Sequence, residues 1–81
     1  MSAEEIFKTL QALVAEEFVT SPESVTMDTS FEDDLGANSV DLVELAMAME
    51  ERFDIDEVPE DELAALKTVG DAVRLLTGKL K

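Results

Sequence analysis

Apolar residues recur every three or four positions in four stretches of the chain, the spacing of one buried face of an α-helix. Capping-box patterns, with an acid three positions after a hydroxyl residue, mark the starts of the first and last stretches at Ser2 and Thr68. The first helix is expected to end near Thr20, because Pro22 disfavours helix at the residue before it. The first three predicted helices cover residues 2–20, 39–53 and 60–66. The fourth begins at Thr68 and frays or stops near Gly78.

Between the first two predicted helices lies a long loop, residues 21–37. A loop of this length in a small domain needs apolar anchors, and Val25 and Phe31 are the expected ones, with Met27 and Leu35 as further candidates. No stretch alternates between polar and apolar residues as a strand would. The pattern therefore predicts one all-α domain over residues 1–81, a compact four-helix bundle of three longer helices and one short third helix.

Composition narrows the function. The 81 residues include no His, Cys, Trp or Tyr, so the commonest general base and the best nucleophile are absent, and a Ser–His–Asp site cannot be assembled. Without His and Cys a typical zinc site is also excluded, and no acidic run has the spacing of an EF-hand loop. We therefore expect neither an enzyme nor a metal site. No apolar run approaches the roughly 18 residues of a membrane span, which indicates a soluble, cytoplasmic protein or a mature organellar one.

The formal net charge of −14 argues against nucleic acid or an anionic membrane as a partner. Fourteen of the twenty acids fall between Asp28 and Glu62, a segment whose one base is Arg52. A solvated surface explains any single acid. The concentration of acids in this middle segment of the chain favours a docking surface for basic partners.

The predicted second helix has two faces with different properties. One is an ordinary core stripe of Leu42, Leu45, Ala46, Met49 and Phe53. On the opposite side two apolar residues alternate with two carboxylates, which suits a partner surface, although scattered exposed apolar residues are common. These four residues are Val40, Glu44, Met47 and Glu51.

The start of this helix carries the candidate chemistry. Gly36 permits a sharp turn, and Asn38, with Asp41 three residues later, is a good N-cap. Ser39 then falls at the first helical position with its hydroxyl pointing outward, where free backbone N–H groups and the helix dipole favour a phosphate. A serine before a helix is more often itself the cap, so the residue alone is weak evidence.

Residues 35–45, LGANSVDLVEL, resemble the phosphopantetheine site of acyl carrier proteins, usually read as LGADSLDxVEL. The chain is similar to that family over essentially its whole length, including Thr29-Ser30-Phe31, Val58-Pro59 and Thr68-Val69-Gly70-Asp71. The resemblance implies that a phosphopantetheinyl transferase attaches a 4′-phosphopantetheine arm from coenzyme A to Ser39. The thiol of the arm would carry growing acyl chains as thioesters to the enzymes of fatty acid synthesis, with the carrier acting as a monomer.

The family's other functional positions can be carried over in the same way. Val40, Glu44 and Met47 match the family's recognition-helix positions. Its acidic contacts, which bind basic patches beside the active-site entrances of the partner enzymes, are matched by Asp41, Glu50 and Glu51. An acyl chain sheltered between the helices would be lined by Leu45, Ala46, Leu63 and Leu66.

The chain departs from the family pattern at three places. Asn38 stands where the family usually has Asp, Val40 stands where it usually has Leu, and residues 54–59 are one residue longer than expected. The loss of one charge beside Ser39 keeps open a carrier dedicated to a polyketide, lipid-modification or amino-acyl pathway. Outside the carrier class, the alternative is an unmodified acidic helical adaptor for a basic enzyme.

Overall fold

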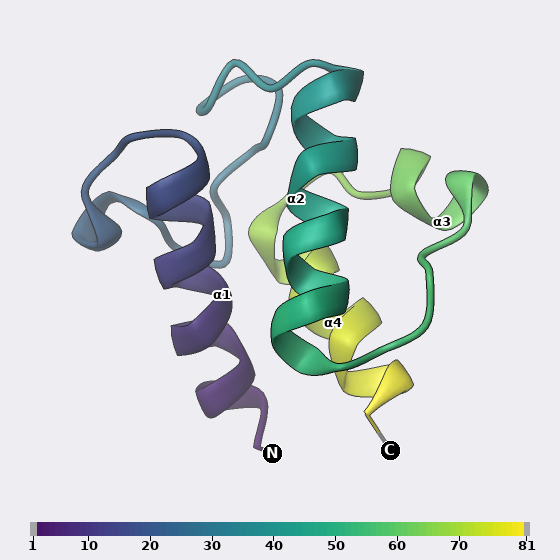
Figure 1. Ribbon diagram of the computed structural model, residues 1–81. Coiled ribbons are helices and arrows are strands. Elements are labelled where there is room, and N and C mark those ends of the chain that lie inside the picture. Colours follow the sequence, from purple (N-terminus) through teal and green to yellow (C-terminus); the bar gives the residue numbers. More distant parts are fainter. Residues whose placement is uncertain (1, 81) are drawn as a thin grey trace.

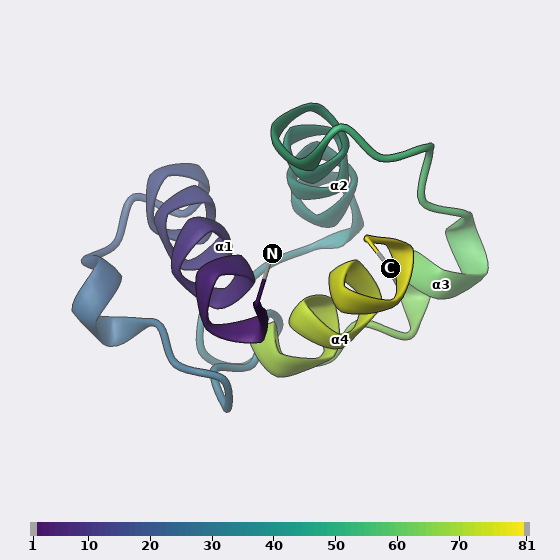
Figure 2. The same cartoon turned by 90° about the horizontal axis from the view of Figure 1, so that it is seen from below.

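The structure is a computed structural model that describes residues 2–80. In these residues the chain forms α1 (Ala3–Glu17), the 3-10 helix η1 (Pro22–Ser24), α2 (Ser39–Phe53), α3 (Glu60–Ala64) and α4 (Val69–Lys79). The helices α1 and α2 lie side by side and run in opposite directions (Figure 1). Seen along the bundle, α1, α2 and α4 surround a common core, and the short α3 lies at its edge (Figure 2). The predicted all-α architecture is confirmed.

The core is built from the predicted apolar stripes. Ile6, Leu10 and Val14 of α1 are completely buried, and the stripes of α2 and α4 meet them. The other core residues include Leu45, Ala46, Met49, Phe53, Val69, Ala72, Val73 and Leu76, with Leu13, Phe18, Leu42 and Leu80 partly buried against them. No helix within residues 2–80 is both long enough and apolar enough to cross a membrane.

Both sequence-predicted capping boxes are present in the structure. The Ser2 hydroxyl accepts from the Glu5 N–H at 3.2 Å, and the Glu5 carboxylate accepts from the Ser2 N–H at 3.0 Å. The Thr68 hydroxyl and Asp71 form the corresponding pair at the start of α4. Each box satisfies backbone donors that a helix start leaves without an intrahelical acceptor.

The first helix ends at Glu17, three residues earlier than predicted. The reason is that Val19 adopts a left-handed backbone conformation, with φ at 51°, and the Thr20 N–H donates to the Ala15 carbonyl at 2.9 Å. This pattern closes a helix by satisfying a carbonyl of its last turn. The chain thus leaves α1 before Pro22 has any influence.

The long loop is held mainly by backbone hydrogen bonds to the residues that lead into α4. The N–H groups of Val69 and Gly70 donate to the carbonyls of Thr29 and Met27 at 2.9 and 2.8 Å, and the Phe31 N–H donates to the Lys67 carbonyl at 3.0 Å. Ser30 and Thr68 accordingly form an isolated antiparallel bridge. The loop is therefore docked along a line of contacts rather than at its apolar anchors alone.

The anchor residues differ in burial. Val25 and Phe31 are buried as predicted, and Leu35 is partly buried, but Met27 leaves 40% of its surface exposed. A second attachment that the sequence did not predict comes from Gln11, whose side-chain amide donates to the carbonyls of Pro22 and Val25 at 2.8 and 2.9 Å. These bonds hold η1, also not predicted, against α1.

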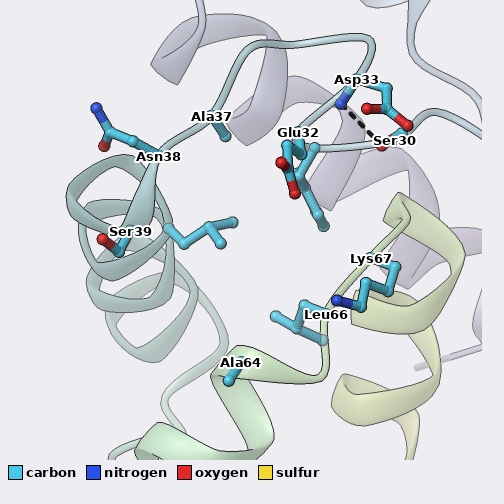
Figure 3. Close-up of a pocket in the computed structure, with 11 residues that line it drawn as sticks. Ser30, Glu32, Asp33, Ala37, Asn38, Ser39, Ala64, Leu66 and Lys67 are labelled. Carbon is cyan, nitrogen blue, oxygen red and sulfur yellow. Dashed lines mark hydrogen bonds between the residues drawn. The ribbon is translucent and has the colours of Figure 1, made fainter.

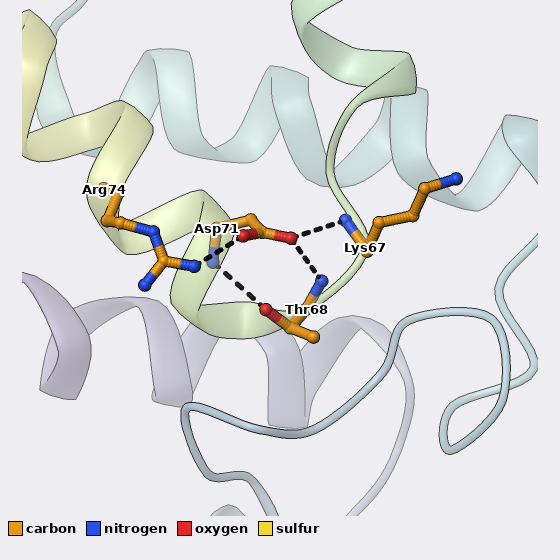
Figure 4. A network of polar contacts seen from close by, with 4 residues as sticks. All are labelled: Lys67, Thr68, Asp71 and Arg74. Carbon is orange, nitrogen blue, oxygen red and sulfur yellow. Dashed lines mark hydrogen bonds and ion pairs between the residues drawn. The ribbon is translucent and has the colours of Figure 1, made fainter.

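The entry into α4 is organised by Asp71 (Figure 4). One carboxylate oxygen of Asp71 accepts from the backbone N–H groups of Lys67 and Thr68, both at 3.0 Å, and the other pairs with Arg74. The Arg74 guanidinium and then these two N–H groups lower the pKa of Asp71 from its ordinary value. The charged carboxylate therefore stabilises the link between α3 and α4.

The ends of the last two helices also differ from the sequence prediction. The third helix ends at Ala64 rather than at residue 66, because Ala65 and Leu66 already bond in i→i−3 fashion as the chain turns toward α4. Both predicted inner residues, Leu63 and Leu66, are nevertheless buried. Gly78 does not stop α4, which continues to Lys79, where the ammonium pairs with Glu62 of α3 at 3.2 Å.

Gly70 offers a test of the loop docking. A Cβ at this position would lie 2.9 Å from the Met27 carbonyl oxygen, a backbone atom that cannot move without shifting the loop. We predict that Gly70→Ala lowers the free energy of unfolding by about 1–3 kcal/mol, since overpacking forces the backbone apart. Urea unfolding followed by circular dichroism would measure it.

The matched control is Gly78→Ala in the same helix, where a Cβ would meet nothing within 4 Å. Alanine should raise the free energy of unfolding there by about 0.5–1 kcal/mol through its better helix propensity. Stabilisation by both substitutions would show that the loop is not held against Gly70.

Candidate functional site

Ser39 occupies the first position of α2, as predicted, and Asn38 caps the helix. The Asn38 side-chain oxygen accepts from the Asp41 N–H at 2.9 Å, and the Asp41 carboxylate accepts from the Asn38 N–H at 3.1 Å. Gly36, with φ at 64°, makes the turn into this start. Because the capping oxygen comes from Asn38, the Ser39 hydroxyl is not needed as a cap, and the residue is exposed.

Beside Ser39 the surface is hollowed between three segments of the chain (Figure 3). The hollow has a volume of about 510 Å³ and lies between the loop at residues 30–33, the start of α2 and residues 64–67. Its apolar wall comes from Phe31, Ala37, Leu42, Ala64 and Leu66, and its polar rim includes Ser39, Glu32, Asp33 and Lys67. A groove of this kind can receive a flexible group attached at its rim.

Further hollows follow the line between α2 and α3. One of about 400 Å³ is bounded by Ser39, Leu42, Val43, Glu60, Asp61, Leu63 and Ala64. Another, farther along α2, is bounded by Val43, Ala46, Met47, Glu50, Glu57, Val58, Glu60 and Leu63. The line of hollows thus begins at the candidate serine and runs along the inner side of α3.

Three of the four residues predicted to line an acyl cavity border these hollows. Leu66 borders the hollow beside Ser39, Leu63 borders both hollows between α2 and α3, and Ala46 borders the farther one. Leu45 borders none of the three and is buried in the core. Leu42, which was not predicted to line the cavity, borders the two hollows that Ser39 also borders. Its position three residues after Ser39, on the same side of the helix, is the sequence signal that could have identified it.

The outer face of α2 is exposed as the sequence predicted. Val40 and Met47 leave 64% and 61% of their surfaces uncovered, and Glu44 and Glu51 are exposed between and beyond them. Val43, with 46% of its surface exposed, is a further apolar residue on this face that the sequence pattern did not predict. Exposed apolar side chains flanked by carboxylates form a surface suited to a partner with apolar and basic groups.

The remaining predicted contact residues, Asp41 and Glu50, also serve the fold. Asp41 caps α2 through one carboxylate oxygen. Glu50 is partly buried, and one of its oxygens accepts from the Val58 N–H at 2.9 Å, which ties α2 to the segment before α3. A partner would bind these two carboxylates only through the oxygen lone pairs that accept no internal hydrogen bond.

Carboxylates from two helices crowd together where α1 passes the start of α2. A hydrogen bond with Glu44, then partial desolvation, then the charges of Glu44, Asp41 and Glu16 raise the pKa of Glu17 from its ordinary value. Within residues 2–80, no group of three or more acidic side chains is arranged to hold a metal ion. The repulsion between these carboxylates destabilises the folded state locally.

Comparison with known proteins decides the family. A family model described as the phosphopantetheine attachment site matches residues 8–76. The chain belongs to this family. It is 49% identical over 75 residues to an acyl carrier protein of Caulobacter vibrioides, covering 93% of this chain and 95% of that one. An acyl carrier protein of Prochlorococcus marinus is 44% identical over 79 residues, 98% of each chain.

A solved structure agrees with the sequence relatives. An acyl carrier protein from Enterococcus faecalis superimposes with a TM-score of 0.79 at 25% identity, over 98% of this chain and 99% of that one. The resemblance noted at residues 35–45 is confirmed at the level of the family. The chain is an acyl carrier rather than an enzyme, its cofactor is phosphopantetheine, and its role implies interaction with partner enzymes.

The start of α2 fits this cofactor. Ser39 is exposed, the cap is supplied by Asn38, and a hollow with an apolar wall opens beside this residue. When attached, the arm supplies a thiol, which no side chain of this chain has. The chain's own residues supply the exposed attachment point, a fixed helix start and a groove.

The crowded carboxylates near α2 generate a prediction about pH. Because the folded-state pKa of Glu17 is raised, its ionised form opposes folding, and the penalty disappears as pH falls through that pKa toward the unfolded value. Glu17→Gln should therefore stabilise the protein at neutral pH by no more than about 1 kcal/mol, since exposed charges are screened. Glu44→Gln should act in the same direction. Below the ordinary pKa of glutamate, the gain should vanish.

Thermal unfolding at neutral and acidic pH would measure these gains. The control is Glu57→Gln, which removes the same charge from an exposed loop position before α3. If Glu57→Gln stabilised the protein as much as Glu17→Gln, the effect would come from net charge and not from the contact between α1 and α2.

Proposed function

We propose that Ser39 is the attachment point of the phosphopantetheine arm and that the chain carries growing acyl groups on it for fatty acid synthesis. The observation that carries the proposal is an exposed serine hydroxyl at the first position of α2, with its helix capped by Asn38 and an apolar hollow at its side. The family match at residues 8–76 spans this serine. A phosphodiester on Ser39 would meet the free N–H groups and the positive end of the helix dipole, which favour negative charge there.

The outer face of α2 is proposed as the surface that partner enzymes recognise. Val40 and Met47 would enter apolar depressions, while Glu44 and Glu51 would pair with basic side chains around them. Asp41 and Glu50 would contribute the carboxylate oxygens that their internal hydrogen bonds leave free. The expected partners are a phosphopantetheinyl transferase and the basic-patched enzymes of fatty acid synthesis.

The hollows between α2 and α3 are proposed to shelter the acyl chain. Leu63 and Ala46 border them, and Leu66 borders the adjoining hollow beside Ser39. Leu45 lies buried beneath, where it could contact a chain only if the helices moved apart. Apolar walls favour an alkyl chain over water. We further propose that the carrier is monomeric and cytoplasmic and that residues 1–81 form a single domain.

One observation favours a second candidate within the carrier class. Asn38 removes a negative charge directly before Ser39, at the position where the family usually has Asp. The Asn38 side-chain oxygen caps α2, which supports an effect of the substitution on recognition rather than on folding. A carrier dedicated to a polyketide, lipid-modification or amino-acyl pathway would be served by such a change.

The attachment point is tested by mass spectrometry. Incubation with coenzyme A and a broad-specificity phosphopantetheinyl transferase should add one phosphopantetheine to the wild-type chain and none to Ser39→Ala. Since Asn38 supplies the cap, Ser39→Ala should keep its helicity. The control is Ser24→Ala at an exposed position of η1, which should be modified as well as wild type. Modification of Ser39→Ala would refute the assignment, and no modification of wild type by any transferase would favour an unmodified adaptor.

The partner surface is tested by turnover of the loaded carrier with a fatty acid synthesis enzyme. Glu44→Lys should lower kcat/KM by about tenfold, equivalent to about 1.4 kcal/mol, because it places a positive charge before a basic patch. Met47→Ala should lower it by loss of apolar contact. Glu23→Lys makes the same charge change on η1, which lies across α1 from α2 (Figure 2), and should leave turnover unchanged. Equal losses at Glu44 and Glu23 would assign the effect to net charge.

A further inference from the structure

Among residues 2–80, Lys67 is the one base that borders the hollow beside Ser39. It lies in the segment between α3 and α4, across the hollow from the start of α2. Its ammonium group is directed toward the hollow, as Figure 3 shows. The other charged residues on this border, Glu32 and Asp33, are acids. A single positive charge therefore faces a hollow whose remaining charges are negative.

The backbone of Lys67 is fixed on both sides. Its carbonyl accepts from the Phe31 N–H at 3.0 Å, and its own N–H donates to the Asp71 carboxylate at 3.0 Å (Figure 4). These bonds hold the residue between the loop and the start of α4. The position from which the side chain extends is thus set by the tertiary structure, and only the flexible stem remains to be ordered.

The charge of Lys67 is not used by the fold. The ion pairs in the described part of the chain join Lys8 to Glu4, Arg74 to Asp71 and Lys79 to Glu62, and none includes Lys67. The side chain is exposed although the protein carries a net charge of −14. A fixed base that faces an acidic hollow without an ion pair is available to an anionic ligand.

We propose that Lys67 binds the phosphodiester of the phosphopantetheine arm and thereby holds the arm across the hollow. This inference rests on the proposed attachment at Ser39. The phosphodiester brings a permanent negative charge to a rim that already has Glu32 and Asp33. Lysine binds phosphate as a flexible point charge, so its stem can follow a phosphate on the opposite rim. Lys67 is then a positioning residue that determines where the arm rests between encounters with partner enzymes.

The proposal is tested by comparing the apo and holo proteins by ¹H–¹⁵N and ³¹P NMR. In wild type, attachment of the arm should shift the amide signals of Ala64, Leu66 and Phe31 across the hollow as well as those beside Ser39. In Lys67→Gln the shifts across the hollow should fall by at least half, and the ³¹P signal should move. Lys67→Arg, which keeps the charge, should restore the wild-type pattern, and high salt should weaken the shifts in wild type.

The matched control is Lys8→Gln, which removes the same charge from the exposed side of α1 and should leave the pattern as in wild type. Both bonds that fix Lys67 use backbone atoms of that residue, so Lys67→Gln should fold normally, and its apo spectrum checks this. Identical apo-to-holo shifts in wild type and Lys67→Gln would overturn the proposal. Failure of the attachment at Ser39 itself would show as an absent mass gain, which separates the two proposals.

Discussion

The docking of the long loop onto the entry of α4 is the constraint on which the rest of the structure depends. Backbone N–H groups of Val69 and Gly70 reach carbonyls of the loop, and the Phe31 N–H reaches back to Lys67. The approach is so close at Gly70 that a Cβ would meet the Met27 carbonyl at 2.9 Å. These bonds fix two of the three walls of the hollow beside the candidate serine. The third wall, the start of α2, follows from the turn at Gly36.

The acidic residues of this protein have two separable uses. Asp34, Asp41 and Asp71 accept hydrogen bonds from backbone N–H groups at turns and helix starts, and Glu50 does so at the segment before α3. These carboxylates satisfy backbone donors that would otherwise depend on water. The exposed acids of α2, Glu44 and Glu51, have no such bond within residues 2–80. The high density of charge is thus partly structural, and the remainder stays available to basic partners.

This division also explains where the acidic surface carries a cost. Glu17 and Glu44 approach each other closely enough to raise the pKa of Glu17. A surface optimised for stability alone would place a base at one of these positions. If its partner enzymes present basic patches, as proposed above, unneutralised acids favour their binding, because electrostatic attraction raises the rate of encounter more than the final affinity.

The chemistry of a carrier suits a chain of this size and composition. In residues 2–80 a small core supports three longer helices and a surface groove beside Ser39. The reactive thiol arrives with the cofactor, so the chain needs no cysteine. What the protein contributes is placement: an exposed serine on a capped helix, a hollow with an apolar wall beside it, and an exposed apolar and acidic face along the same helix.

The sequence by itself determined the helices, their apolar faces, two of the caps at Ser2 and Thr68, and the exposed serine after Asn38, because each depends on neighbours within about one helical turn. It also carried the family motif.

The tertiary structure decided the early end of α1, the bonds from Gln11 to η1 and the burial of Leu45 away from the hollows. It also decided the position of Lys67, which borders the hollow beside Ser39 because the loop and α4 are docked together. Contacts between residues far apart in the chain leave no periodic signal, and the hollow is made of such contacts.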